Sequence, residues 1–173
     1  LDWYQKQITK GSVPTLAKTL AEFDRELKSR YITSDDYDYC VSKGHAALSN
    51  YLTARAAMFT NTQALSEVDF AREGVLINNI AHITGKIDRL EIDTKEKTIH
   101  IVDFKTGKPA SSWAKELKYL KYRQQLYFYK LLIEGSHTYK GYTVVSGRLE
   151  FVEPNKQGGV AEPLTVVYDQ DET

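Results

Sequence analysis

The chain has little of what disulfide-stapled, thiolate-metal or membrane proteins need. Its 173 residues include one cysteine, Cys40, so it can form neither an internal disulfide nor a metal or iron–sulfur centre held by several cysteines. It has no signal peptide and no apolar run long enough for a bilayer, which predicts a cytoplasmic protein without membrane contact. It also lacks an initiator methionine. Leu1 is therefore interpreted as the start of a domain excised from a longer protein, although a trimmed chain would begin in the same way.

The chain has no excess of charge of either sign. Its 23 Lys and Arg residues balance 23 Asp and Glu residues, which excludes a strong overall attraction to nucleic acid or to an anionic membrane. The charge is nevertheless unevenly placed, because residues 105–130 hold a single acid, Glu116, among the basic residues Lys105, Lys108, Lys115, Lys118, Lys121, Arg123 and Lys130. This run is either a solvated helix face or a surface that follows phosphates, and the sequence leaves both open.

Residues 1–60 are predicted to be mainly helical. A first helix is expected over residues 14–30, with Pro14 in its first turn and an apolar face made of Leu16, Leu20, Phe23 and Leu27. A second is expected over residues 36–59, and His45 falls on its apolar stripe. We interpret His45 first as a partly buried side chain with a satisfied partner, and second as a metal ligand.

Residues 65–173 are predicted to form a sheet and one long helix. The helix covers residues 113–134 and ends at Gly135, which suits a left-handed cap. The strand-like runs lie at residues 67–71 continuing through 75–77, then 83–92, 98–105, 142–152 and 164–168. This order predicts one α+β domain with a mixed β-sheet, a three-stranded antiparallel meander plus further strands, flanked by helices.

The central hairpin is expected to bring two carboxylates together. A turn over residues 93–98 would place these pairs opposite each other: Ile92 with Ile99, Leu90 with Ile101, Asp88 with Asp103, and Lys86 with Lys105. Because side chains alternate along strands, all of these pairs share one face. Two opposed carboxylates repel each other, so the pair Asp88 and Asp103 either raises one pKa or binds a cation.

These residues suit hydrolysis of a phosphodiester with a divalent metal ion. Asp88 and Asp103 would ligate Mg²⁺ or Mn²⁺, with the backbone carbonyl of Phe104 as a third oxygen, since such hard cations take oxygen ligands. The metal would lower the pKa of a bound water, and Lys105 would orient that water or stabilise charge on the phosphorus. The alternative is an ordinary hairpin that carries exposed charges.

Three short motifs occupy this part of the chain. They are Gly85-Lys86-Ile87-Asp88-Arg89, then Val102-Asp103-Phe104-Lys105-Thr106-Gly107, and a Gln-x-x-x-Tyr pair made of Gln125 and Tyr129. Together they resemble the PD-(D/E)XK nuclease superfamily, and within it the RecB-type nuclease domains. The spacing puts Gln125 and Tyr129 on one helical face, where the resemblance implies a catalytic contact with phosphate or with the lysine. The alternative is that Tyr129 belongs to the core and Gln125 only fills a turn of the helix.

The resemblance also bears on two residues outside these motifs. Glu67 stands where relatives have a glutamate before the first strand, so it is either a metal ligand, a support for one, or a surface residue. RecB-type nucleases carry a metal-touching histidine in a Gly-x-x-x-His pattern. Here Gly44 directly precedes His45, which puts that role in doubt. The iron–sulfur cluster of some RecB-type relatives is excluded by the single cysteine.

The function implied is that of a metal-dependent deoxyribonuclease, with exonuclease action favoured over endonuclease action and single-stranded DNA as the favoured substrate. Such domains lie at the C-terminus of UvrD/Rep-like or AddAB-type helicases, which implies helicase motor domains as partners in DNA repair or recombination. One alternative is a catalytically inactive DNA-binding or scaffold domain. Another is a metal hydrolase of small phosphoesters, which the basic helix and the lack of a phosphate-binding glycine loop disfavour.

Overall fold

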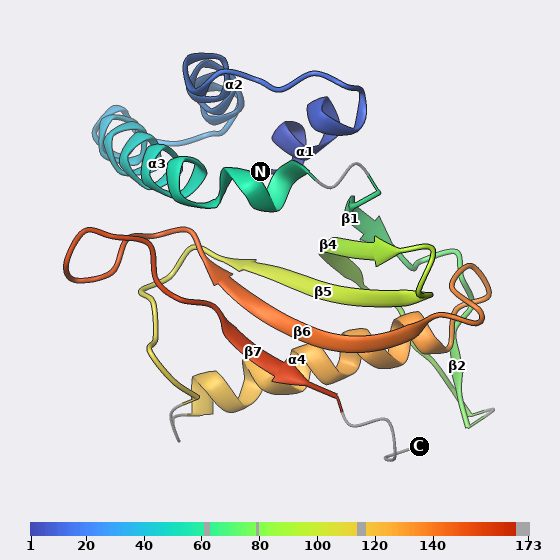
Figure 1. The fold of residues 1–173 in the computed structure, drawn as a ribbon. Coiled ribbons are helices and arrows are strands. Elements are labelled where there is room, and N and C mark those ends of the chain that lie inside the picture. Colours follow the sequence, from blue (N-terminus) through green and yellow to red (C-terminus); the bar gives the residue numbers. More distant parts are fainter. Residues whose placement is uncertain (61–62, 79, 114–116, 169–173) are drawn as a thin grey trace.

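The computed structural model describes residues 1–60, 63–78, 80–113 and 117–168. Figure 1 shows a central sheet with helix α4 against one face and helices α1 and α3 over the other. Its five strands are β1 (Leu65–Asp69), β4 (Lys86–Asp93), β5 (Thr98–Lys105), β6 (Thr143–Phe151) and β7 (Leu164–Val167), in the order β1-β4-β5-β6-β7. All neighbours are antiparallel except β5 and β6, which are parallel. The predicted mixed α+β fold is confirmed.

The hairpin between β4 and β5 has the predicted register. Leu90 pairs with Ile101 and Ile92 with Ile99, and the turn is held by Asp93, whose Oδ1 accepts hydrogen bonds from the backbone N–H groups of residues 95 and 96 at 2.9 Å. A short side chain that bonds backbone N–H groups just beyond it is a strong local turn signal. This explains why the register could be predicted from the sequence.

The predicted cationic pair of Lys86 and Lys105 is not formed. Lys86 lies opposite Asp69 of β1, and its Nζ contacts the carboxylate of Glu67. Lys105 instead turns its Nζ to Asp103, at 2.6 Å. Each lysine is therefore paired with an acid, Lys86 with Glu67 and Lys105 with Asp103, which avoids the repulsion of two facing cations.

The helices are α1 (Asp2–Thr9), α2 (Leu16–Lys28), α3 (Ser34–Arg55), the 3-10 turn η1 (Ala56–Thr60) and α4 (Leu117–Glu134). Pro14 precedes α2 rather than lying in its first turn, because Thr15 is the N-cap and accepts from Lys18 N at 3.3 Å. Similarly, Thr33 caps α3 and accepts from Asp36 N at 3.2 Å. The second helix therefore begins earlier than predicted, and the last residues predicted for it form the 3-10 turn η1 instead.

Helix α1 was not predicted from the sequence. Its eight residues are too few for a helix that is stable alone, so tertiary contacts must hold it. Tyr4 and Ile8 supply these contacts by packing with Tyr51, Leu52 and Phe59 in a hydrophobic cluster above the sheet.

The predicted strand over residues 67–77 is wrong as one element. β1 ends at Asp69, whose Oδ1 accepts from Ala71 N at 2.8 Å and so turns the chain. Leu76–Ile77 (β2) then pairs with Ala81–His82 (β3) in a separate hairpin. The antiparallel meander is therefore β1-β4-β5, with the β2–β3 hairpin inserted between its first two strands.

Two predictions about the ends of α4 are also wrong. Trp113 is not helical, and its Nε1 donates to Thr165 O at 3.0 Å; the remaining predicted residues before Leu117 lie outside the described residues. Gly135 does not have a left-handed φ. A Cβ there would lie 2.5 Å from Val75 Cγ1, so glycine is required by close packing rather than by a cap.

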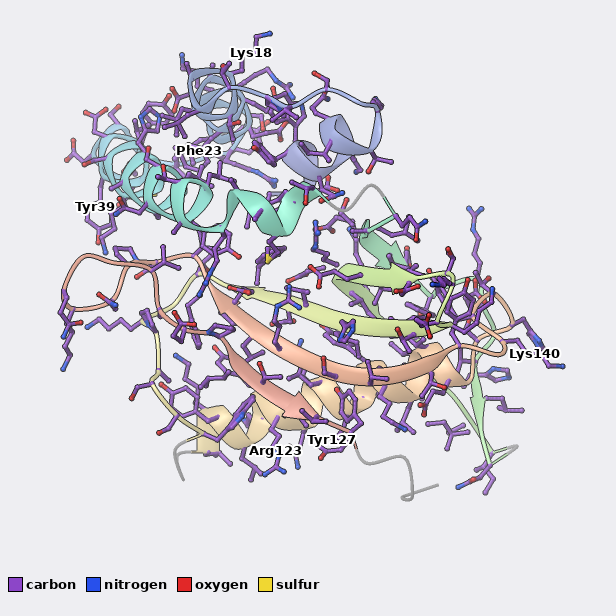
Figure 2. The ribbon with its side chains drawn as sticks, in the orientation of Figure 1. Lys18, Phe23, Tyr39, Arg123, Tyr127 and Lys140 are labelled. Carbon is purple, nitrogen blue, oxygen red and sulfur yellow. The ribbon has the colours of Figure 1, made fainter. Side chains whose placement is uncertain are left out.

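The main core lies between α4 and the sheet, and a smaller cluster lies under α1 and α3. The main core contains Leu126, Leu132 and Ile133 of α4 against Ile99 and Ile101 of β5. Figure 2 shows side chains on both sides of the sheet, between it and each helical layer. Within the described part of the chain, no helix is both long and apolar enough to cross a membrane.

Candidate active site

Three acidic residues lie at the same level on neighbouring strands. In the β1–β4 ladder the pairs on either side of Glu67 and Asp88 are Ser66 with Arg89 and Val68 with Ile87, so Glu67 lies beside Asp88. In the β4–β5 ladder the last pair is Arg89 with Val102, and Asp88 and Asp103 follow it. The register thus puts the carboxylates of β1, β4 and β5 in one row, with Asp88 in the middle.

The strands separate at this row. Instead of continuing the backbone ladder, Phe104 N–H donates to Asp88 Oδ2 at 2.8 Å. Glu67 has φ +55°, a left-handed conformation that is uncommon for a residue other than glycine. This left-handed residue interrupts the extended backbone of β1 at the carboxylate row. It leaves the Glu67 side chain in an ion pair with Lys86.

Asp103, Lys105, Gln125 and Tyr129 form a closed ring of polar contacts between β5 and α4. Lys105 Nζ lies 2.6 Å from Asp103 Oδ2 and donates to Gln125 Oε1 at 2.8 Å. Gln125 Nε2 donates to the Tyr129 hydroxyl oxygen at 2.8 Å, and that hydroxyl donates to Asp103 Oδ1 at 3.3 Å. Asp103 is only 2% exposed. The Tyr129 hydroxyl satisfies its Oδ1, whereas its buried Oδ2 has no hydrogen-bond partner among the described residues and lies against the charge of Lys105.

The ring depends on two simple periodicities. Asp103 and Lys105 are two residues apart on β5 and therefore point to the same face, and Gln125 and Tyr129 are one helical turn apart on α4. Lys105 Nζ also lies 4.4 Å from the ring centroid of Tyr122, a cation–π contact that fixes the lysine from its other side.

The electrostatics distinguish Asp88 from its neighbours. Burial raises the pKa of Asp88, and the charges of Asp103 and Glu67 raise it further, while the Phe104 N–H opposes the shift. The pKa of Tyr129 is raised by burial and then by Asp103 and Asp88. Tyr129 therefore keeps its proton and acts as a hydrogen-bond donor at neutral pH, whereas a nearby cation would favour the ionised form of Asp88.

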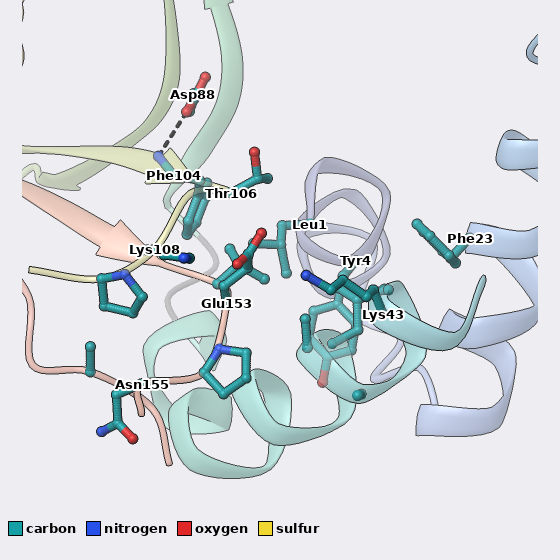
Figure 3. Close-up of a pocket in the computed structure, with 18 of the residues that line it drawn as sticks. Leu1, Tyr4, Phe23, Lys43, Asp88, Phe104, Thr106, Lys108, Glu153 and Asn155 are labelled. Carbon is teal, nitrogen blue, oxygen red and sulfur yellow. Dashed lines mark hydrogen bonds between the residues drawn. The ribbon is translucent and has the colours of Figure 1, made fainter. Parts of the chain in front are cut away.

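A cleft of about 1800 Å³ opens in front of the carboxylate row. Asp88, Phe104, Thr106 and Lys108 line it from the sheet and the loop after β5. The helical layer and the segment after β6 supply other walls, among them Tyr4, Phe23, Lys43, Glu153 and Asn155. Figure 3 shows Asp88 bonded to Phe104 at the edge of this space, with the ends of Lys108 and Glu153 directed into it. Asp88 thus borders the cleft, whereas the four residues of the ring do not line it.

His45 contacts helix α2. Its Nε2 is 2.6 Å from Asp24 Oδ1, which joins α3 to α2, and its ring packs edge-on to Phe23 at 6.0 Å between centroids. The interpretation as a partly buried histidine with a satisfied partner agrees with this geometry.

Sequence reasoning missed the aromatic side chains next to the ring. Tyr122 contacts Lys105, and Tyr119 packs against Tyr122 at 6.2 Å between centroids. The available signal was spacing, because Tyr122 precedes Gln125 by three residues and so lies on the same helical face.

The donor atoms of this row are oxygens, which are the ligands that hard divalent cations prefer. Asp88, Asp103 and Glu67 offer only carboxylate oxygens. Burial is the main cause of the raised pKa of Asp88, and the charges of Asp103 and Glu67 add to it; a bound cation would relieve this repulsion. In the described ranges, however, no group of three or more His, Cys, Asp or Glu side chains is gathered closely enough to hold a metal ion. Glu67 is paired with Lys86, which leaves Asp88 and Asp103 as the other two acids of the row.

The chain is similar to a solved structure described as "Crystal structure of SSO0001", with 14% identity and a TM-score of 0.36 over 90% of this chain and 80% of that chain. No curated protein matches the chain. The family model of the PD-(D/E)XK nuclease superfamily matches residues 1–172. Since this match spans nearly the whole sequence, the chain belongs to the PD-(D/E)XK nuclease superfamily.

Proposed function

We propose that this domain is a divalent-metal-dependent deoxyribonuclease whose active site is Asp88 together with the ring of Asp103, Lys105, Gln125 and Tyr129. The observation that carries the proposal is the closed ring, in which a buried carboxylate and a lysine are both held by α4 beside a second carboxylate of raised pKa. A hairpin with merely exposed charges would not need two helical side chains to hold its lysine.

Each residue has a role that its contacts support. Asp88 and Asp103, with the carbonyl of Phe104, would hold Mg²⁺ or Mn²⁺, and Glu67 is a nearby carboxylate for the same region. The ion would polarise the phosphate and lower the pKa of a bound water. Lys105 would stabilise negative charge on the phosphorus, because its ammonium is already aimed by Gln125.

Tyr129 and Gln125 would act on this lysine and carboxylate rather than on the metal. The Tyr129 hydroxyl donates a hydrogen bond to Asp103 Oδ1, and its raised pKa keeps it protonated. It therefore occupies Oδ1 and leaves Oδ2 as the oxygen beside Lys105. Gln125 bridges Lys105 and Tyr129. Both are therefore proposed to position the catalytic pair.

The proposal extends to substrate and context. We expect exonuclease action on single-stranded DNA, as part of helicase-coupled repair or recombination, with motor domains in the same chain or complex and residues 1–173 as one nuclease domain. What supports this is the likeness of the three motifs to RecB-type domains. A linear and a circular single strand of the same sequence distinguish the modes, because an exonuclease leaves the circle uncut.

The decisive experiment compares cleavage of labelled DNA by the wild type, Asp103→Ala and Lys105→Ala, with Mg²⁺, Mn²⁺ or chelator. Each variant should lose on the order of a hundred-fold or more in rate, because a charge-stabilising group is removed. Lys95→Ala is the matched lysine control, since Lys95 lies at the turn between the same two strands and is 90% exposed.

Equal cleavage by Asp103→Ala and the wild type would rule out this site. No cleavage by the wild type under any condition, with DNA binding retained, would identify the domain as an inactive binding or scaffold module.

A further inference from the structure

Lysine and tyrosine side chains alternate outward from the active site along the first turns of α4. Lys105 Nζ lies 4.4 Å from the ring centroid of Tyr122. Lys118 Nζ lies 5.6 Å from the same centroid and 5.9 Å from that of Tyr119. The two rings meet edge to face, at 6.2 Å and 72°. The catalytic lysine is therefore the first member of a continuous row of cations and aromatic rings.

The outer end of this row faces the cleft that contains Asp88. Tyr119 lines that cleft together with Asp88 and Thr106, although its ring is also partly packed on the main core. Lys118 is exposed, and its Nζ is close enough to Gly107 that a Cβ there would be 3.5 Å away. Its ammonium thus sits over the loop that directly follows Lys105.

We propose that Tyr119 and Lys118 form a nucleotide subsite next to the active site, in which Tyr119 stacks on a base and Lys118 binds an adjacent phosphate of a single DNA strand. Aromatic rings beside cations bind single strands in this way, and every base offers a π-face. In a duplex that face is covered by the neighbouring base pair, so the subsite selects unpaired DNA. The inference rests on the proposed nuclease function, and it adds a reason for strand preference.

The chain contains a matched control at the far end of the same strand. Tyr142 packs edge to face with Tyr139, at 6.5 Å and 88°, and Lys97 Nζ lies 4.7 Å from the Tyr142 centroid. Like Tyr119, Tyr142 is partly buried against the main core. Lys97 precedes β5, whereas Lys105 ends it, so this second lysine–tyrosine cluster lies at the opposite end of β5 from the active site.

The test measures binding rather than cleavage. Fluorescence anisotropy in chelator gives the Kd of oligothymidylate of roughly 12 nucleotides and of an abasic strand of equal length. Tyr119→Leu should weaken oligothymidylate about tenfold, the usual effect of losing one stacked base, and leave the abasic strand unchanged. Lys118→Gln should weaken both strands and lower the salt slope of binding by about 0.7.

Tyr142→Leu and Lys97→Gln should change neither affinity. Tyr119→Phe keeps the ring and should restore oligothymidylate binding, which also guards against a folding defect in Tyr119→Leu. The proposal is overturned if Tyr119→Leu binds oligothymidylate as tightly as the wild type does, or if its affinity falls equally for oligothymidylate and for the abasic strand. It is also overturned if Tyr142→Leu weakens oligothymidylate binding as much as Tyr119→Leu does. Because no step requires catalysis, base-specific binding by a wild type that fails to cleave would leave the subsite standing and refute only the nuclease proposal.

Discussion

The two faces of the sheet bury charge in opposite ways. On the face covered by α1 and η1, Arg89 is 1% exposed and donates to Met58 O at 2.6 Å, to Gln5 Oε1 and to Glu91. Arg148 binds Glu91 with two hydrogen bonds of 2.8 Å. On the face covered by α4, Asp88 has one backbone donor and two neighbouring acids, whose effect the charge of Lys105 offsets only in part. On the first face Arg89 and Arg148 balance the charge of Glu91. On the second face the carboxylate of Asp88 has no cation paired with it in the described residues.

The pKa values of two acids on one strand record this difference. Burial raises the pKa of Glu91, but the hydrogen bonds and charges of Arg148 and Arg89 outweigh it, and the net shift is downward. The pKa of Asp88 is shifted upward by burial and by Asp103 and Glu67. A buried acid that is paired with arginines, such as Glu91, joins strands to one another. A buried acid that lacks such a partner, such as Asp88, is a candidate for binding a ligand or a metal ion. The structure thus separates a stabilising network from a candidate active site.

The largest expected effect is on the network face. Arg89→Ala should lower the free energy of unfolding by roughly 3–5 kcal/mol, because it leaves the Met58 carbonyl without this donor and removes one of the two arginines that offset the charge of Glu91. Urea unfolding measures this loss, and Arg72→Ala, at an exposed arginine, is the control. A loss below about 1 kcal/mol would mean that water replaces the guanidinium, and the contrast between the faces would then be much weaker.

Metal binding should act only on the other face. A divalent ion that binds the folded state at about a hundred times its Kd stabilises the protein by roughly 2.7 kcal/mol, which differential scanning calorimetry detects as a higher Tm with Mg²⁺ or Mn²⁺ than with chelator. Asp88→Asn should reduce this shift. Gln125→Ala should keep the shift and slow cleavage, since Gln125 contacts Lys105 and Tyr129 and not Asp88.

Two results would contradict this assignment. An undiminished metal shift in Asp88→Asn would place the ion elsewhere. A shift in Gln125→Ala that falls as far as in Asp88→Asn would mean that α4 takes part in holding the ion.

The smallest effect is on pH dependence in chelator, and its sign differs between the faces. Asp88 has a raised folded pKa, so its contribution to stability is present below its ordinary value of 3.8 and is lost as the pH rises through the folded pKa. Glu91 has a lowered folded pKa, so its contribution is present above 4.5 and is lost as the pH falls through the folded pKa.

Urea midpoints between about pH 3 and pH 7 should therefore move apart in the two variants. Relative to the wild type, Asp88→Asn should gain stability toward neutral pH, and Glu91→Gln should lose it. A large loss for Asp88→Asn at neutral pH without metal would show that Asp88 supports the fold rather than a site.

Much of the site could be predicted because it depends on local rules. The turn at Asp93, the alternation along β5 and the turn-by-turn spacing of Gln125 and Tyr129 are all set within a few residues. The β4–β5 register followed from them. Contacts between residues distant in sequence were predicted less accurately. Nothing in the sequence near Lys86 or Gly135 reveals that their neighbours are Glu67 and Val75.

By itself, the sequence determined the helices and strands other than α1 and the β2–β3 hairpin, the pairing of β4 with β5, and the presence of two acids and a lysine at one end of that hairpin. Only the tertiary structure decided which charges were satisfied. Alternation along β4 assigns Asp88 and Arg89 to opposite faces, but whether each finds a partner depends on what packs there. The physical reason is that the free energy of a buried charge is set by groups distant in sequence, here η1 and β6 for Arg89 and Glu91 and α4 for Lys105.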